Sequence, residues 1–263
     1  MRPYYYLGNN LGLTKLEMGY KMLVDTSDLS LGAHVISDGF WAKHIDHFLS
    51  GVIKKGDSCL DLGCHMGYTA LLMAGLSQRL VVCYDMNADM VELTKKNFAL
   101  NGLDGDFFVS AITTGKDDGK PKRVHFLLDD SNSGGARVMG LAEKTQPLLA
   151  GTNLSMATHA RDIMNGTVYN KYYSSFVKID LEGMDWFVAD VMRPRKMILE
   201  HRPKDALTHE GKDHTHSTLE QCMRNIFDVY YVQIIQGDGT GYTVPSPESI
   251  MNKEHLDLFL EHK

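Results

Sequence analysis

Two acids and two glycines stand at a spacing that suits a ligand-binding turn. The run Asp61-Leu62-Gly63-Cys64-His65-Met66-Gly67 follows a strand-like apolar segment and opens a helix-like one. Glycine lets the backbone approach a ligand closely where a strand turns into a helix. Asp85 ends the next apolar segment, where a carboxylate can accept both hydroxyls of a ribose. The pattern therefore predicts the binding of a nucleotide or a related ligand.

The same run lacks the features of the commoner nucleotide loops. A dinucleotide fingerprint needs three glycines, and a P-loop needs Lys-Ser/Thr after its last glycine; the run has neither. Asp61 at the strand end would repel a pyrophosphate, whereas it would attract a cation. S-adenosylmethionine carries an ammonium and no phosphate. We therefore expect this donor, with Gly63 and Gly67 near its methionine part, Asp61 accepting from its ammonium and Asp85 holding its ribose.

Strand-like and helix-like segments alternate along the chain, which predicts a doubly wound, mostly parallel α/β sheet. The expected strands are 58–62, 81–85, 106–111, 124–128, 174–180 and 196–200, with a closing pair at 229–236 and 241–244. The expected helices are 42–53, 67–76, 88–100, 184–192, 218–227 and 249–261, and 129–153 is expected to be rich in loops. The short turn in the closing pair makes one strand antiparallel at the end of the sheet. Ligands bind at the carboxyl ends of such strands, so one crevice should lie among Asp61, Asp85, Ala111, Asp180 and Glu200.

The composition is that of an ordinary globular protein. The chain has 263 residues, 43% of them hydrophobic, and a formal net charge of -6. An acidic chain has no basic footprint, so duplex nucleic acid is not expected as a partner. None of the four cysteines forms a CxxC pair, which favours a reduced, cytoplasmic location. No apolar run approaches the ~20 residues of a membrane span, so none is expected.

The N-terminal segment differs from the rest of the chain. Residues 1–40 are rich in tyrosine, leucine and glycine and show weak periodicity. We expect them to form an arm or lid, with residues 41–263 forming the S-adenosylmethionine-binding domain. A tyrosine-rich arm could also be exchanged between subunits of a homo-oligomer.

Four segments together resemble the FkbM-type methyltransferases. They are DLGCHMGYTALLMA (61–74), DMNADMVELTKKNFALNGL (85–103), SNSGGARVM (131–139) and FVKIDLEGMDWFVADVMRPRKMILEHRP (176–203). The resemblance extends over about residues 28–245, although Met86 stands where the family usually has proline and His65 where it has asparagine. It implies a class I methyltransferase fold, with S-adenosylmethionine as the donor and S-adenosylhomocysteine as the product. It also implies a hydroxyl acceptor on a glycan or a small natural product.

Together the pattern and the resemblance give a set of expected cofactor-binding residues: Asp61, Gly63, Cys64, His65, Gly67, Tyr68, Asp85, Met86, Ser110 and Ala111. Methyl transfer to oxygen mainly requires the acceptor to be held in line with the methyl group, and a base can take the hydroxyl proton. Asp180, Glu182 and His201 follow two strands that end at the crevice, so these three are the expected catalytic residues. Acids at this place could instead stabilise the dipole of the following helix.

Two further interpretations stay open. Asp180, Glu182, Glu200 and His201 could ligate a hard cation such as Mg²⁺, but acids gather at strand ends in this fold without a metal, so no metal is assigned. The run His209, His214 and His216 lacks regular ligand spacing and is interpreted as a solvated loop.

Two other functions compete with transfer to a glycan or small molecule. An RNA 2′-O-methyltransferase often uses a Lys-Asp-Lys-Glu set, but Glu200 stands at the strand end where the second lysine would be. A non-catalytic protein that binds adenosine ligands would need no acceptor residues, and the intact acids argue against it. A dehydrogenase is the least favoured of these functions, because the third glycine of the dinucleotide fingerprint is missing.

Overall fold

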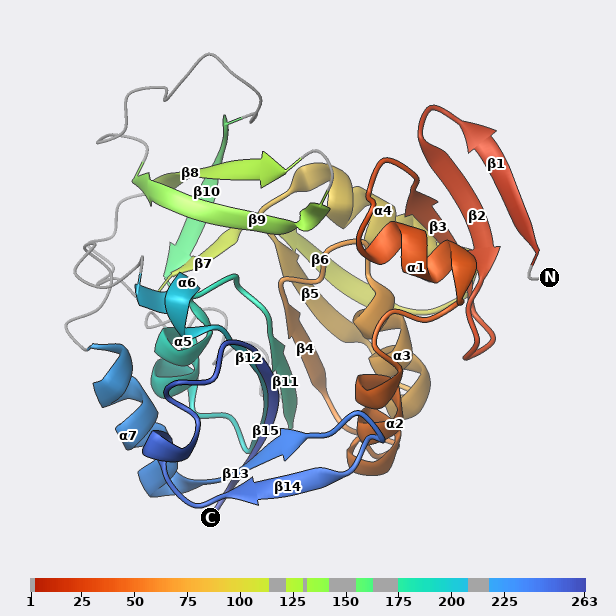
Figure 1. Cartoon of the computed structure of the whole chain (residues 1–263). Coiled ribbons are helices and arrows are strands. Elements are labelled where there is room, and N and C mark those ends of the chain that lie inside the picture. Colours follow the sequence, from red (N-terminus) through yellow and green to blue (C-terminus); the bar gives the residue numbers. More distant parts are fainter. Residues whose placement is uncertain (1–2, 114–121, 130–131, 142–154, 163–174, 208–217) are drawn as a thin grey trace.

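The computed structural model describes residues 3–113, 122–129, 132–141, 155–162, 175–207 and 218–263 (Figure 1). Its centre is an eight-stranded sheet with the order β14-β13-β15-β12-β11-β4-β5-β6. The bounds are β4 (Cys59–Leu62), β5 (Val81–Asp85), β6 (Gly105–Val109), β11 (Phe176–Ile179), β12 (Lys196–His201), β13 (Tyr230–Ile235), β14 (Gly241–Val244) and β15 (Leu256–His262).

The five strands from β12 to β6 run parallel, whereas β15 is antiparallel to both β12 and β13. This is the class I methyltransferase arrangement, so the expected doubly wound, mostly parallel sheet is confirmed. The parallel strands are apolar because helices cover both of their faces. All four residues of β4 are buried.

Helices on the two faces of the sheet create two apolar cores. The bounds are α2 (Lys43–Val52), α3 (Tyr68–Ser77), α4 (Ala88–Leu100), α5 (Asp185–Met192), α6 (Pro203–Leu207) and α7 (Leu219–Val229). Successive residues of a strand point to opposite faces. Leu60 and Leu62 of β4 therefore join Trp186 of α5 in one core, whereas Cys59 joins Leu71 of α3 in the other. All four cysteines are free and buried.

The chain end corrects one expected element. A helix was predicted over 249–261, but the structure has a 3-10 turn, Pro247–Ser249, followed by β15. Leu258 and Leu260 face one core and Phe259 faces the other, which is the burial of a central strand and not of a helix. The apolar run in LDLFLEH fits either element at this length, so periodicity alone could not decide.

A second sheet lies between β6 and β11 in the chain, and one of its strands runs through the region predicted to be loop-rich. Strands β7 (Ala111–Thr113), β8 (Lys122–Asp129), β9 (Asn132–Leu141) and β10 (Ser155–Asp162) form a sheet with the order β7-β10-β8-β9. The predicted strand 124–128 lies within β8 but in this sheet and not in the central one. The expected loop over 129–153 is corrected where β9 runs, and residues 142–154 lie outside the described part.

The N-terminal segment forms three antiparallel strands, β1 (Tyr4–Gly8), β2 (Leu11–Lys15) and β3 (Lys21–Asp25), followed by α1 (Leu31–Ser37). Two asparagines, Asn97 of α4 and Asn101 directly after it, bond to the open edge of β3. The Asn97 side chain accepts from the Leu23 N–H at 2.7 Å and donates to the Leu23 carbonyl at 3.0 Å, and Asn101 makes the same pair with Lys21. The strands are thus fastened to the main body, beside α4 in Figure 1. Their action as a lid or exchanged arm stays a prediction.

Candidate functional site: a two-part cavity

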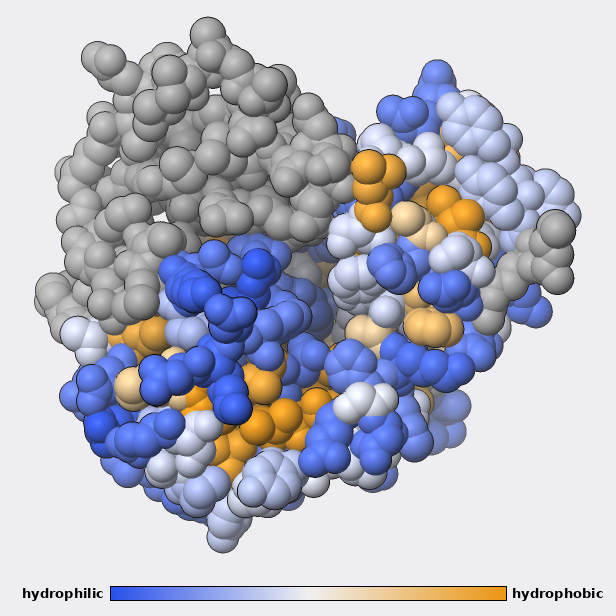
Figure 2. All heavy atoms as spheres, viewed as in Figure 1, coloured by the Kyte–Doolittle hydropathy of each residue, from blue (hydrophilic) through white to orange (hydrophobic). Residues whose placement is uncertain are grey.

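A cavity of about 660 Å³ lies at the carboxyl ends of β4, β5, β11 and β12. Its lining comes from the β4–α3 turn, the ends of these strands, the chain before α2 and the chain before β15. Phe40 and Trp41 line it from the N-terminal side. We call the part around the β4–α3 turn and Asp85 the donor half, and the part around Asp180, Glu182 and Glu200 the acceptor half. Hydrophilic residues gather on the face over α6 (Figure 2).

Hydrogen bonds from the backbone of the β4–α3 turn to the neighbouring strand β5 hold the turn in place. The N–H groups of Gly63 and Cys64 both donate to the Tyr84 carbonyl, at 2.9 and 3.0 Å. Gly63 has φ +80°, and a Cβ atom there would overlap the Asp180 carbonyl oxygen. Gly67 has φ +87°, and its Cβ would lie 2.6 Å from a Thr94 methyl of α4. Both glycines are therefore needed for close packing between elements. Gly63 also lines the cavity, and Gly67 does not.

Asp85 organises the donor half. Its Oδ2 accepts the His65 N–H and its Oδ1 accepts the Asn87 N–H, both at 2.8 Å. Each carboxylate oxygen has a second lone pair, so Asp85 can still accept from two hydroxyls. Burial raises the pKa of Asp85, against the N–H groups that favour its charged form. The predicted residues Cys64, Tyr68, Met86, Ser110 and Ala111 line the same half.

His65 connects this half to the N-terminal segment. Its Nε2 lies 3.5 Å from Asp28 Oδ2, while Asp28 Oδ1 accepts the N–H groups of Ser30 and Gly32 at the start of α1. Burial lowers the pKa of His65, against the attraction of Asp85 and Asp28. The His65 backbone is left-handed, with φ +49°. This costs about 1 kcal/mol or more for a residue with a Cβ, and the Asp85 bond helps to hold it there.

Asp61 does not have the contact predicted for it. It is fully buried and does not line the cavity, so it cannot accept directly from a ligand there. Its two carboxylate oxygens have no hydrogen-bond partner among the described residues, and Lys178 Nζ lies 3.4 Å from one of them. The prediction placed Asp61 at the end of the strand correctly. The apolar pattern of the strand did not indicate that the Asp61 side chain is buried below the cavity wall.

Lys178 is a functional candidate that the sequence reasoning missed. Its Nζ donates to the Gly63 carbonyl at 2.9 Å and lies 3.1 Å from Asp180 Oδ2. Burial acts to lower the pKa of Lys178, but Asp180 and Asp61 outweigh it and raise this pKa above its usual range. Burial raises the pKa of Asp61 to about 6, against the ammonium of Lys178. The sequence did offer one indication of this role, because Lys178 is a charged residue inside the otherwise apolar strand β11.

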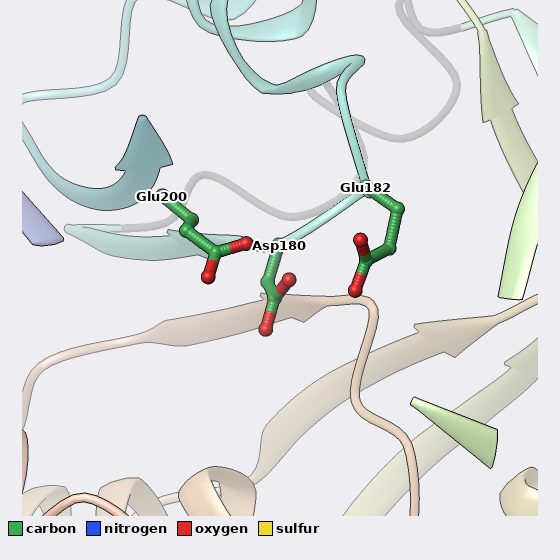
Figure 3. A group of neighbouring side chains, drawn as sticks. All are labelled: Asp180, Glu182 and Glu200. Carbon is green, nitrogen blue, oxygen red and sulfur yellow. The ribbon is translucent and has the colours of Figure 1, made fainter. Parts of the chain in front are cut away.

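Asp180, Glu182 and Glu200 meet in the acceptor half (Figure 3). One carboxylate oxygen from each lies within 4.8 Å of the others. Arg202 Nη1 lies 2.5 Å from Glu182 and 3.6 Å from Glu200. Burial, then Asp180, raises the pKa of Glu182 to about 7 despite Arg202, and burial with Asp180 and Asp185 raises that of Glu200 to about 9. Arg202 already supplies a positive charge to this cluster, so we assign no metal to it.

His201 is not in the cavity, which argues against its predicted catalytic role. Its ring is fully buried, Nδ1 accepts from the Trp186 indole N–H at 3.0 Å, and Nε2 lies 3.0 Å from the Ile250 carbonyl. Burial lowers its pKa to about 4, so the ring is neutral. The alternation of β12 explains this placement, because Glu200 faces the cavity and its neighbour His201 therefore faces the core.

Two histidine–carboxylate pairs line the acceptor half and were not predicted. His255 Nε2 lies 2.7 Å from Glu200 Oε1, and His44 Nε2 lies 2.9 Å from Asp257 Oδ2. Glu200 and Asp257 stand opposite each other on β12 and β15. Each of these two facing carboxyl groups therefore has a histidine partner of its own. The sequence separation of these residues left no local signal. The predicted loop residues His209, His214 and His216 lie outside the described residues.

Part of the chain is similar to a known protein family. A family model described as a methyltransferase small domain matches residues 41–124. The tRNA (uracil-54, C5)-methyltransferase of Pyrococcus abyssi, solved with S-adenosyl-L-homocysteine, is 10% identical with a TM-score of 0.44; the match covers 97% of this chain and 45% of that one. Aeropyrum pernix fibrillarin, solved with S-adenosyl-L-methionine, is 10% identical with a TM-score of 0.44, and the match covers 99% and 97%. No curated protein matches the sequence.

A third structure corrects the expectation about nucleic acid. The complex of aTrm5 with tRNALeu is 12% identical with a TM-score of 0.43, and the match covers 97% of this chain and 54% of that one. The prediction that ruled out duplex nucleic acid from the acidic net charge is corrected: the structures similar to this chain include one in complex with tRNA, and net charge alone does not exclude such a partner. Net charge is a property of the whole surface, and a local basic area can bind a phosphate backbone within an acidic total. Among the described residues, no helix is long and apolar enough to cross a membrane.

The strand order and the family match both indicate a methyltransferase fold. The chain spans less than half of the P. abyssi enzyme, and the family model covers one part of the chain. The FkbM type is not among these findings and stays a prediction. The chain has the class I methyltransferase fold, and its residues 41–124 match the methyltransferase small domain.

Proposed function

We propose that the chain transfers a methyl group from S-adenosylmethionine to an acceptor hydroxyl on a glycan or a small natural product. The observation that carries this proposal is the joining of two sets of residues in one cavity. The β4–α3 turn and Asp85 form one wall, and Asp180, Glu182 and Glu200 form another. A donor and an acceptor held in one enclosed space can react as if in a single molecule.

The donor half fits an adenosine ligand in its hydrogen-bonding capacity. Asp85 keeps a free lone pair on each oxygen for the ribose hydroxyls. Ser110 and Ala111, beyond the end of β6, would then contact the adenine side, and the β4–α3 turn the methionine side. S-adenosylmethionine supplies the methyl group from its sulfonium centre when bound.

The acceptor half offers a base. Glu182 lines the cavity, and its pKa of about 7 lets it hold a proton or release it near neutral pH. We propose that Glu182 accepts the hydroxyl proton as the acceptor oxygen attacks the methyl group. Arg202, which ion-pairs with Glu182, orients that carboxylate. Asp180 Oδ2 lies 3.1 Å from Lys178 Nζ and is engaged in that ion pair.

Titration calorimetry with S-adenosylmethionine, S-adenosylhomocysteine and NAD tests the donor. Binding of the two adenosyl ligands and not of NAD is expected. Failure to bind either adenosyl ligand would remove the proposal. Methyl transfer from labelled S-adenosylmethionine is then measured on glycans, small hydroxylated compounds and RNA in parallel. Labelling of RNA alone would replace the glycan or small-molecule acceptor, whereas labelling of an amine and not of any hydroxyl would replace oxygen as the acceptor atom.

A further inference from the structure

The buried charges beneath the β4–α3 turn point to a role for Asp61 that needs no ligand contact. Asp61, Lys178 and Asp180 form a triad, with Lys178 Nζ 3.4 Å from Asp61 and 3.1 Å from Asp180. Two carboxylates and one ammonium leave one negative charge. Asp61 is fully buried and its oxygens lack hydrogen-bond donors among the described residues, so water does not screen it. Such a charge acts over several ångströms.

The sheet order places this triad beside the expected position of the donor sulfur. Strands β11, β4 and β5 are neighbours, about 4.8 Å apart. A ribose held by Asp85 lies at the end of β5. In S-adenosylmethionine one carbon joins the ribose to the sulfur, on the side away from the adenine. With the adenine towards β6, the sulfur would lie over the β4 turn, where Lys178 Nζ donates to the Gly63 carbonyl.

We propose that the Asp61–Lys178–Asp180 triad is the specificity determinant that makes the cavity prefer the charged donor to its uncharged product. The proposal rests on the proposed function. S-adenosylmethionine carries a sulfonium charge, whereas S-adenosylhomocysteine has a neutral thioether and is otherwise alike. The net negative charge of the triad attracts only the first. Such a preference weakens the product relative to the donor after each turnover.

The ratio of the two dissociation constants measures this effect separately from structural damage. A variant that distorts the turn weakens both ligands together, because they share the adenosine and the amino acid end. A variant that removes one charge changes the ratio. Asp61→Asn is nearly isosteric and removes a charge that touches no ligand. We expect the preference for S-adenosylmethionine over S-adenosylhomocysteine to fall about five- to tenfold at pH 8.

Asp190→Asn is the matched control. Asp190 is a largely buried acid on α5, ion-paired with Arg193 at 2.7 Å, and it does not line the cavity. Its replacement should leave the ratio within twofold of the wild type. If Asp61→Asn does not fold, Asp180→Asn removes one negative charge from the same triad at a more exposed position and should lower the ratio in the same direction.

Each outcome decides between the proposals. A lower ratio in the triad variants with an unchanged ratio in Asp190→Asn supports the inference. An unchanged ratio in Asp61→Asn, or in Asp180→Asn where that variant is needed, overturns it while leaving the proposed donor in place. A wild-type protein that binds neither adenosyl ligand overturns the proposed function itself.

Discussion

The donor and acceptor halves of the cavity are assembled in different ways. The donor half comes mainly from one short stretch, the β4–α3 turn, together with the ends of the next two strands along the chain. The acceptor half joins residues from α2, β11, β12 and the start of β15, which stand far apart in the sequence. A local pattern can specify the first half. Only the order of the strands in the sheet brings the second together.

The two halves also hold their charges differently. In the donor half, Asp85 is held by two backbone N–H groups, that of His65 in the β4–α3 turn and that of Asn87 before α4. In the acceptor half, Glu182 and Glu200 are held by other side chains, mainly Arg202 and His255. A charge held by backbone keeps its geometry when a neighbouring side chain changes. Substitutions in the acceptor half should therefore spread their effects through the cluster, whereas those in the donor half should stay local.

The largest effect is expected where the halves meet, at Lys178. Lys178→Met leaves Asp61 buried without its only cation within ion-pairing distance among the described residues. Removing one partner of a buried ion pair costs about 3–5 kcal/mol. Urea unfolding should show this loss. Lys204→Met removes an exposed lysine paired with Glu254 and should leave the unfolding midpoint unchanged. A loss below about 1 kcal/mol for Lys178→Met would mean that the two halves are not joined through this side chain.

The next largest effect is expected at Asp85. Asp85→Ala removes the acceptor of the ribose hydroxyls and also frees the N–H groups of His65 and Asn87. Hydrogen bonds to a charged group contribute about 1.5–3 kcal/mol each, so S-adenosylhomocysteine binding should weaken about 100-fold or more. Titration calorimetry measures this loss of affinity for S-adenosylhomocysteine. Asp104→Ala, just before β6 and exposed, should bind as the wild type does. Equal affinities for the two variants would place the ribose elsewhere.

Sequence reasoning succeeded where chemistry and chain order coincide. The turn from Gly63 to Tyr68 and the acid Asp85 were predictable because one strand, one turn and one helix determine where they lie. The parallel strands were predictable from their apolar runs. Asp61 shows the limit of this reasoning: its position at the strand end was predicted, but its depth depends on Lys178 of β11, 117 positions away in the chain.

The acceptor half was only partly predictable for the same reason. Asp180 and Glu182 were found because they follow an apolar strand directly. His255 and Asp257 were missed because the apolar run after them was interpreted as part of a helix, and a helix there would not pair with β12. When 256–262 is recognised as the strand β15, its pairing with β12 places Asp257 opposite Glu200, which brings His255 and Asp257 into the acceptor half. The error in one element thus concealed a wall of the cavity.

A smaller effect is expected at His255. His255→Asn removes the ring that pairs with Glu200 at 2.7 Å in the acceptor half, and it leaves the donor half untouched. We expect S-adenosylhomocysteine binding within twofold of the wild type. Methyl transfer, measured as kcat/KM on an acceptor identified by labelling, should fall about tenfold, the value of one hydrogen bond. His262→Asn, at the far end of β15, is the control. Weaker S-adenosylhomocysteine binding in His255→Asn would show that the halves are not independent.

The smallest effect is expected at Asp46 of α2, which accepts a hydrogen bond from the Tyr68 hydroxyl in the wall of the donor half. Burial raises the pKa of Asp46 to about 6, against that hydrogen bond. The folded protein therefore binds a proton that the unfolded chain has already released at pH 5, and this stabilisation is lost as the pH rises through 6. Between pH 5 and pH 8 the loss should be about 1 kcal/mol.

Asp46→Asn keeps an acceptor for the Tyr68 hydroxyl and cannot titrate, so its stability should vary less between pH 5 and pH 8 than that of the wild type. Urea unfolding at the two pH values measures the difference, and Asp228→Asn, an exposed acid at the end of α7, should keep the wild-type slope. The acceptor half contains its own acid with a raised pKa, Glu182, whose pKa is about 7. If Asp46→Asn also keeps the full wild-type slope, the pH dependence comes from other buried acids with a raised pKa, such as Glu182 in the acceptor half and Asp61 beneath the β4–α3 turn.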